Sequence, residues 1–306
     1  MSLLHQMRTF TRVAELSSFS QAALDLGLPK ATVSTAVQQL ENTLGTRLLH
    51  RTTRSVALTQ DGQAFYERSK DALADIDELQ AMFQQPSTSA ALALKGRVRV
   101  DMSTVMARCA VLPRLPELLQ LHPQLEIELS STERRVDLVS EGFDCVVRAG
   151  KVTDPGLVSR PLPPMPMVNC ASPQYLARHG TPQTLDDLAQ HQLVHYAATL
   201  GAKCSGFEYV ADDGMEYAIP MGGPLTVNNA EAYQAACLSG LGLIQAPLAG
   251  VGDAVADGRL VAVLPGHRAR PMPLSLVYAN RRNQPARVRV VMDWLSGVVT
   301  EYVKRY

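Results

Sequence analysis

The His, Ser, Asp and Glu residues of this sequence do not have the spacing of any of the common catalytic motifs. The chain contains no GxSxG, HExxH, Walker A or GxGxxG motif. His191 and His195 are four residues apart, which would suit a metal on a helix. The apolar pair between them indicates a strand instead, on which this spacing is too wide for one ion. Glu126 and Glu128 alternate with apolar residues, which indicates a half-exposed strand rather than paired catalytic carboxylates. We therefore expect a protein that is not an enzyme and that has no cofactor or metal.

A second group of polar residues has the spacing of a nucleic-acid-binding helix. After Pro29, the apolar residues Val33, Val37 and Leu40 recur at helical intervals and mark a buried stripe. The opposite face carries small and amide side chains with almost no charge, namely Ala31, Thr32, Thr35, Gln38, Gln39 and Asn42. Solvated helix faces usually carry Lys and Glu, whereas Thr and Gln can contact base edges in DNA. An ordinary polar face is the alternative interpretation.

The segments around this helix would position it. Residues 3–14 form an amphipathic pattern, Ser20 is a predicted N-cap for residues 21–26, and Gly27 ends that helix. Residues 47–59 have the pattern of two short strands around a turn that carries Arg51 and Arg54. Together these elements predict a winged helix-turn-helix. Its third helix would enter the major groove while the arginines contact phosphates.

Residues 1–60 resemble the DNA-binding domain of the LysR-type transcriptional regulators. The ordered match includes Ser18-Phe19-Ser20-x-Ala22-Ala23, Val33-Ser34 and the run Leu40-Glu41-x-x-Leu44-Gly45-x-Arg47-Leu48-Leu49-x-Arg51-Thr52-Thr53-Arg54. Two positions depart from the family pattern. Pro29 stands where a Ser commonly begins the recognition helix, and Thr35 stands where an Arg commonly follows Val-Ser. The usual base preference of the family therefore does not carry over to this chain by resemblance, and Lys30 is expected to replace some of the lost charge.

Charge is distributed unevenly along the 306 residues. Lys+Arg and Asp+Glu both total 29, so the net charge is zero and a globally basic nucleic-acid binder is excluded. Residues 1–60 nevertheless carry six basic and three acidic groups, whereas residues 61–85 carry two basic and six acidic groups. We therefore place a boundary near residue 60. The expected DNA-binding residues all precede it: Ser20, Lys30, Ala31, Thr32, Ser34, Thr35, Gln38, Arg51, Thr53 and Arg54.

Residues 59–85 predict one long helix that Thr59 can cap. Six positions, apolar except for Ser69, follow 4-3-4-3-4 spacing like the seam of a short coiled coil: Phe65, Ser69, Ala72, Ile76, Leu79 and Phe83. The alternative interpretation is a single amphipathic helix packed on its own chain. The resemblance favours a linker helix that pairs two copies of the chain. Residues 84–89 are rich in Pro, Ser and Thr, which is typical of a flexible linker.

From residue 96 the pattern alternates strands and helices, including a helix expected around Val136–Ser140, and predicts an α/β domain with a largely parallel sheet. Proline-rich crossovers at 160–166 and 265–273 divide it into two lobes. Phe143-Asp144-Cys145-Val146-Val147-Arg148-Ala149-Gly150 and Gly240-x-Gly242-x-Ile244-x-x-Pro247 resemble the LysR-type effector-binding domain.

The expected fold class is α/β. A winged helix-turn-helix (1–60) is followed by a dimerisation linker helix and hinge (61–92). A two-lobed Rossmann-like, periplasmic-binding-protein-like effector domain (93–306) completes the chain. Lobe I is expected at about 93–163 and 269–306, and lobe II at about 164–268.

Polar residues at strand and helix ends would line the cleft between the lobes. Ser103 and Thr104 open a helix whose free backbone N–H groups favour a carboxylate or similar anion, and Arg148 can serve as a ligand counter-ion or an inter-lobe salt bridge. Gln245 stands where the family usually has an apolar residue, so it can set specificity. Ser103 and the Asn228-Asn229 pair have helix capping as their alternative role. The expected effector-binding residues are Ser103, Thr104, Ser131, Thr132, Arg148, Asn228, Asn229 and Gln245.

These patterns predict a transcription regulator. The expected partners are double-stranded promoter DNA, a small and anionic effector, a second copy of the chain through the linker helix, and RNA polymerase; the resemblance implies a homotetramer. Five cysteines spaced 25 to 36 residues apart, no signal peptide and no long apolar run predict a cytoplasmic protein with reduced thiols and no membrane partner. A small-molecule binding protein without functional DNA readout is the alternative, and an enzyme that kept the α/β domain is a third, less favoured possibility.

Overall fold

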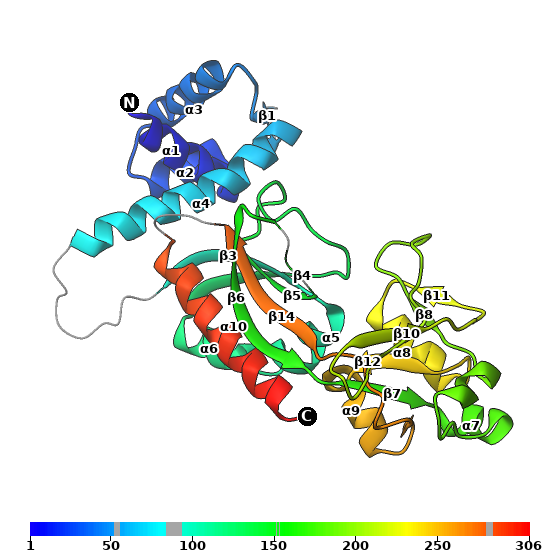
Figure 1. Cartoon of the computed structure of the whole chain (residues 1–306). Coiled ribbons are helices and arrows are strands. Elements are labelled where there is room, and N and C mark those ends of the chain that lie inside the picture. Colours follow the sequence, from blue (N-terminus) through cyan, green and yellow to red (C-terminus); the bar gives the residue numbers. More distant parts are fainter. Residues whose placement is uncertain (52–55, 84–93, 151, 153, 280–283) are drawn as a thin grey trace. The chain divides into compact units, whose positions relative to one another are not determined.

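The computed structural model describes residues 1–51, 56–83, 94–150, 152, 154–279 and 284–306. The chain forms two compact units, Met1–Arg97 and Val98–Tyr306 (Figure 1). None of the described helices is long and apolar enough to cross a membrane.

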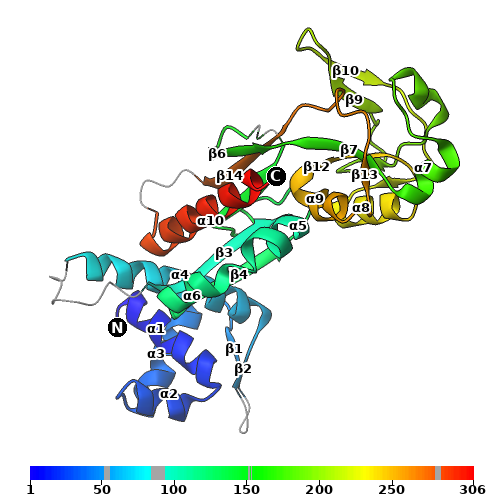
Figure 2. The ribbon, with the colours of Figure 1, turned by 90° about the horizontal axis from the view of Figure 1, so that it is seen from below.

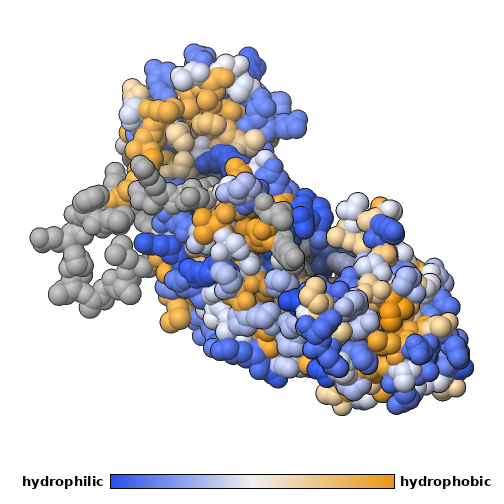
Figure 3. Space-filling view, in the orientation of Figure 1, coloured by the Kyte–Doolittle hydropathy of each residue, from blue (hydrophilic) through white to orange (hydrophobic). Residues whose placement is uncertain are grey.

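The first unit is helical. It contains α1 (Leu3–Leu16), α2 (Phe19–Asp25), α3 (Lys30–Leu44), the strands β1 (Leu49–Arg51) and β2 (Val56–Leu58), and the long helix α4 (Gln60–Phe83). The apolar stripe predicted for α3 is buried, because Val33, Val37 and Leu40 pack on Phe10 and the residues around it. Apolar side chains also remain at the surface: Figure 3 shows them gathered over α1, where Leu3 is 53% exposed.

Two of the capping predictions in this unit have different outcomes. Ser20 does not cap α2; it lies inside the helix, and the Ser18 hydroxyl accepts the hydrogen bond from the Gln21 backbone N–H instead. The reason is that Ser18 has extended backbone angles, so the helix begins at Phe19. Thr59 does cap α4, because its hydroxyl accepts from the Gly62 backbone N–H at 2.8 Å.

The seam predicted along α4 is used partly by the chain itself. The Phe65 ring lies 5.6 Å from the Phe10 ring, and Ser69 is buried. Leu79, nearer the end of the helix, is 52% exposed. The first half of the seam therefore packs within the first unit, as the alternative interpretation of this helix proposed, while the second half presents an apolar side chain to solvent.

The second unit is built on two sheets. The larger sheet has the strand order β4-β3-β5-β14-β6, from β4 (Gln124–Ser131), β3 (Lys95–Met102), β5 (Cys145–Ala149), β14 (Met272–Ala279) and β6 (Leu157–Met165). Strand β5 runs parallel to β3, but β14 runs antiparallel to both β5 and β6, so the sheet is mixed. The helix α10 (Ala286–Lys304) lies along β6 and contributes Val291, Leu295 and Val299 to the main core (Figure 1).

The helical parts of this lobe differ from the prediction. The stretch after β3 divides into α5 (Thr104–Met106), a π-helical turn (Ala107–Val111) and α6 (Leu115–Leu121), and Pro113 and Pro116 lie at the break. The helix expected around Val136–Ser140 is absent from this described stretch, which forms turns. The Asp137 carboxylate accepts from the Val139 and Ser140 backbone N–H groups, and this local bonding replaces a helical turn.

The smaller lobe centres on the sheet β12-β7-β13, from β12 (Ile244–Pro247), β7 (Met167–Ala171) and β13 (Val261–Ala262). Its pairings are antiparallel, so the parallel sheet predicted for this lobe is wrong at its centre. Figure 2 shows α8 (Ala230–Leu238) and α9 (Leu248–Ala256) together on one side of this sheet. The remaining elements are α7 (Pro173–His179), a 3-10 turn (Asp186–Gln190), the pair β8 (His195–Tyr196) and β11 (Thr226–Val227), and the hairpin β9 (Phe207–Val210) with β10 (Glu216–Ile219).

Two crossings connect the lobes. The chain leaves the larger sheet at the end of β6 and returns to it at the start of β14. These points are neighbours, because Met165 pairs with Met272 in the β6–β14 register. The two predicted crossovers are thus side by side.

Candidate functional site

The outer face of α3 presents the polar residues predicted from the sequence. Lys30, Ala31, Thr35 and Gln38 are exposed, and Thr32 and Ser34 are half-buried. Among the described residues, neither Thr35 nor Gln38 has a side-chain hydrogen bond. A helix face of free hydroxyl and amide groups can hydrogen-bond to base edges.

Fixed contacts position α3 within the first unit. The Glu41 carboxylate accepts hydrogen bonds from the backbone N–H groups of Leu48 and Leu49, at 2.9 and 3.2 Å, and so joins α3 to β1. The Arg12 guanidinium bonds both Asp25 and Glu15, which ties α1 to α2 and lowers the pKa of Asp25. The orientation of the helix therefore depends on residues other than those on its exposed face.

The remaining predicted residues of this unit are only partly placed. Ser20 is exposed on α2. The backbone of Arg51 ends β1 opposite Val56, as the predicted strand pair requires. Thr53 and Arg54 lie outside the described residues.

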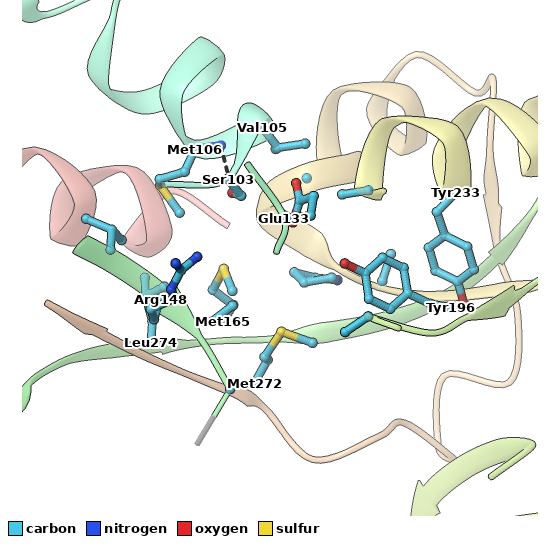
Figure 4. Close-up of a pocket in the computed structure, with 18 of the residues that line it drawn as sticks. Ser103, Val105, Met106, Glu133, Arg148, Met165, Tyr196, Tyr233, Met272 and Leu274 are labelled. Atoms are coloured by element: carbon cyan, nitrogen blue, oxygen red, sulfur yellow. Dashed lines mark hydrogen bonds between the residues drawn. The ribbon is translucent and has the colours of Figure 1, made fainter. Parts of the chain in front are cut away.

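A cavity of about 960 Å³ lies between the two lobes of the second unit (Figure 4). Of the predicted effector-binding residues, Ser103, Thr132, Arg148 and Gln245 line it. Much of the remaining wall is apolar, with methionines from both lobes that include Met106, Met165, Met167 and Met272. Such a wall suits a ligand with an apolar body.

The first turn of α5 is already occupied by groups of the chain. The Ser103 hydroxyl accepts from the Met106 backbone N–H at 3.3 Å, so its capping role is confirmed. The Thr104 backbone donates a hydrogen bond to the Glu133 carboxylate. The position where the sequence suggested an effector anion thus holds a carboxylate of the protein itself.

Arg148 faces the cavity beside a buried acid. Its Nη2 lies 3.2 Å from Oδ2 of Asp101, which is fully buried and also accepts from the Thr132 hydroxyl at 3.0 Å. Burial raises the pKa of Asp101 and lowers that of Arg148. Both residues belong to the larger sheet, so the inter-lobe salt bridge considered for Arg148 is wrong, while its role as a ligand counter-ion stays a prediction.

Gln245 is engaged by its own lobe. Its amide donates to Asn169 Oδ1 at 2.8 Å and to the Glu208 carbonyl at 2.7 Å, and it accepts from the Glu208 backbone N–H at 2.7 Å. The side chain therefore ties β12 to β7 and β9. Its polar groups shape the cavity wall rather than lie free for a ligand.

Four predicted residues are not part of the described lining of the cavity. Ser131 and Asn228 are exposed, and Thr104 is the first residue of α5, next in sequence to Ser103. Asn229 caps α8, accepting from the Glu231 and Ala232 backbone N–H groups at 2.9 and 3.0 Å. Its capping alternative is therefore confirmed.

The sequence patterns missed several residues that line the cavity. Glu133 comes from the turn after β4, Tyr196 from β8 and Tyr233 from α8. The rings of the two tyrosines lie 5.6 Å apart. Neither a two-residue nor a 3.6-residue period singles these positions out.

His191 and His195 serve separate structures. His191 is buried beside the Tyr175 hydroxyl, 3.2 Å from its Nδ1, whereas His195 lies on β8 and lines the cavity. Within the described residues, no group of three or more His, Cys, Asp or Glu side chains could hold a metal.

Comparison with known proteins assigns the two units. Residues 4–63 match the family described as "Bacterial regulatory helix-turn-helix protein, lysR family", and residues 92–299 match the "LysR substrate binding domain". The chain belongs to the LysR family of transcriptional regulators. It is a DNA-binding regulator whose second unit is a substrate-binding domain, and effector control of DNA binding is typical of this family.

Relatives match this LysR-type regulator along its whole length. The uncharacterized HTH-type transcriptional regulator YhjC of Escherichia coli K12 is 48% identical over 99% of this chain and 100% of its own. The HTH-type transcriptional regulator DmlR of the same organism is 33% identical over 99% and 97%. The solved structure of CrgA, a LysR-type regulator of Neisseria meningitidis, has 29% identity and a TM-score of 0.60, and the match covers 96% of this chain and 98% of that one.

Proposed function

We propose that this LysR-type regulator reads promoter DNA with the exposed face of α3 and that a small molecule in the 960 Å³ cavity controls this binding. The observation that carries the proposal is the pair of surfaces itself. One unit offers free hydroxyl and amide groups on a helix that Glu41 bonds to β1, and the other offers a large, mostly apolar cavity between two lobes that neighbouring chain crossings connect. An effector that fits one lobe arrangement better than another would shift the equilibrium between them.

We assign the roles of the DNA-binding residues by their chemistry. Thr32, Ser34, Thr35 and Gln38 would read bases, with Ala31 allowing close approach, while Lys30, Arg51 and Arg54 would contact phosphates with Ser20 and Thr53. The domain limits of this proposal are 1–60 for the DNA-binding domain, 61–92 for the linker helix and hinge, and 93–306 for the effector-binding domain.

We also infer that the regulator acts as a homodimer through the distal part of α4 and assembles into a tetramer. Support comes from the exposed Leu79 on α4 and from the apolar surface over α1 (Figure 3). As a bacterial-type promoter-binding regulator it would act in the cytoplasm, together with RNA polymerase and without turning over its effector. Five free cysteines among the described residues agree with a reducing compartment.

The test is a selection of sheared genomic DNA by the purified full-length protein at two salt concentrations, followed by sequencing of the bound fragments. Enrichment of a few sites with inverted half-sites is the expected result. Absence of enriched sites at both salt concentrations, also with metabolite mixtures added, would favour a small-molecule binding protein without DNA readout.

A further inference from the structure

Two charged side chains of opposite sign line the cavity, and each has one buried atom without a hydrogen bond. Glu133 Oε1 and Arg148 Nη2 are both shielded from solvent, and neither has a hydrogen bond within the described structure. Arg148 Nη2 forms an ion pair with Asp101 Oδ2 at 3.2 Å, but neither atom makes a hydrogen bond. A buried charged atom without a hydrogen bond is costly, so a ligand that supplies the missing hydrogen bonds would be favoured.

The two groups lie in the same wall of the cavity. Figure 4 shows Glu133 beside Ser103 at the start of α5, and Arg148 on the adjoining strand, with open space between them and Tyr196. Each group also influences the pKa of the other through its charge. A single small molecule can therefore reach both.

The charge of the lining argues against a ligand that is only an anion. Among the described residues, four carboxylates line the cavity and only two arginines do, Arg135 and Arg148. The backbone N–H of Thr104 already bonds the Glu133 carboxylate. An anion without a cationic group would leave Glu133 Oε1 without a hydrogen bond and would lie near the negative charge of this carboxylate.

The opposite lobe adds a surface that favours a cation. Tyr196 lines the cavity across from Glu133. Burial raises the pKa of Tyr196, and the negative charge of Glu133 raises it further. The faces of tyrosine rings attract ammonium groups. The Tyr233 hydroxyl, in contrast, is bonded to the Gln245 backbone N–H at 3.1 Å and belongs to the wall.

Resting on the proposed function, we propose that the effector is an ampholyte with an apolar body, which places a protonated amine at Glu133 and an anionic group at Arg148. Glu133 is the specificity-determining residue, because its free oxygen selects the amine. The methionines of the wall hold the apolar part.

The experiment measures binding to the full-length protein by calorimetry with three matched sets of probes. Each set shares one apolar body and comprises an ampholyte, its amine and its acid: L-phenylalanine, 2-phenylethylamine and 3-phenylpropanoate; L-tryptophan, tryptamine and indole-3-propanoate; L-leucine, isoamylamine and 4-methylpentanoate. In at least one set the ampholyte should bind about tenfold or more tightly than either partner, as expected when a charge-assisted hydrogen bond is lost. If no ampholyte binds, or if the acids bind as tightly as the ampholytes, the proposal is overturned.

The variant Glu133→Gln sharpens this result. This substitution should weaken the binding of the ampholyte by about 10- to 100-fold. The acid of the same set should bind as tightly as before or more tightly. The matched control Glu126→Gln removes the same charge from an exposed position on β4 outside the cavity lining and should bind like the parent. An equal loss in both variants would mean that general charge, not Glu133, governs binding.

The same samples separate this proposal from the proposed function. DNA affinity for the selected fragments is measured with each probe present. A simple acid that binds and alters DNA affinity overturns the ampholyte proposal and keeps effector control of DNA binding. Failure of the parent to select any DNA contradicts the proposed function, whereas the calorimetry still decides the ligand class.

Discussion

The α3 face and the cavity lining use polar residues in opposite ways. On α3 the residues Thr35 and Gln38 point to solvent without hydrogen bonds to the described chain. In the cavity, Gln245, Thr132 and Ser103 are bonded to neighbouring groups, and among the described lining residues Glu133 and Arg148 each keep a buried atom without a hydrogen bond. A surface that meets a partner from outside can be recognised from its exposed polar pattern, whereas a cavity must be judged by which of its groups remain unsatisfied.

The largest effect on function should come from a substitution that unfolds the first unit, which carries α3, and leaves the second unit with its cavity intact. In Gly62→Ala the added Cβ on α4 would lie 1.8 Å from the backbone oxygen of Leu48, the residue that precedes β1. Because backbone atoms cannot yield locally, we expect a loss of about 3 kcal/mol or more in the stability of the first unit, and DNA binding should fail. Probe binding in the cavity should persist.

The matched control is Gly297→Ala in α10. A Cβ at Gly297 meets nothing within 4 Å, and alanine is the better helix former, so stability should rise by about 0.5 to 1 kcal/mol. Thermal unfolding of both variants provides the comparison. Parental DNA affinity in Gly62→Ala would contradict the predicted clash.

Replacing Gln245 tests whether its role is structural. In Gln245→Leu the three hydrogen bonds to Asn169 and Glu208 are lost, and the Asn169 amide oxygen, in a side chain that is 1% exposed, loses this donor. We expect the second unit to lose about 2 kcal/mol of stability. Chemical denaturation measures this change, with Gln120→Leu on the exposed side of α6 as the control. A variant of parental stability with altered probe preference would instead assign Gln245 to ligand contact.

Two substitutions on α3 should separate base reading from phosphate contact. Thr35→Ala is expected to change sequence preference by about 1 kcal/mol at one base position, without changing the salt dependence. Lys30→Ala should weaken binding to all sequences alike and reduce the salt slope by about one unit. Titrations of selected and scrambled DNA at several salt concentrations measure both effects. A change of salt slope in Thr35→Ala would contradict its assigned role.

The smallest effect concerns an exposed ion pair in the second unit. Hydrogen bonding to Arg134 lowers the pKa of Glu141 from 4.5 to about 2. Because the folded-state pKa lies below the unfolded value, the ionised carboxylate stabilises the fold above 4.5, and this contribution is lost as the pH falls from 4.5 to about 2. Glu141→Gln should therefore lower the melting temperature slightly at neutral pH and low salt. The difference should shrink in high salt and vanish in acid. A difference that persists below pH 2 would contradict this account.

Regular periodicity explains which features could be predicted from the sequence. The buried stripe of α3, the Thr59 cap and the strand pair around residues 52–55 follow from local spacing, and the structure confirms them. Ser20 failed as a cap because three serines, Ser17, Ser18 and Ser20, precede the same apolar pattern and only backbone angles decide between them. The helix expected at Val136–Ser140 failed because the Asp137 side chain competes for its backbone donors.

The cavity was only half predictable, for a different reason. Arg148 and Ser103 follow strand ends, which general rules mark as ligand positions. Glu133 comes from an irregular turn, and the bonds of Gln245 depend on β7 and β9, which are distant in sequence. Side-chain partnerships across such separations leave no periodic pattern.

The pairing of Met165 with Met272 has a consequence for the evolution of the molecule. The segment between them, which holds the whole smaller lobe, begins and ends at adjacent points of one sheet. The smaller lobe is therefore an inserted segment whose two ends lie close together. Insertion of a domain is best tolerated where the ends lie close together in this way. A new lobe can therefore be grafted at this junction to give a new ligand preference, while the five-stranded sheet and the first unit stay as they are.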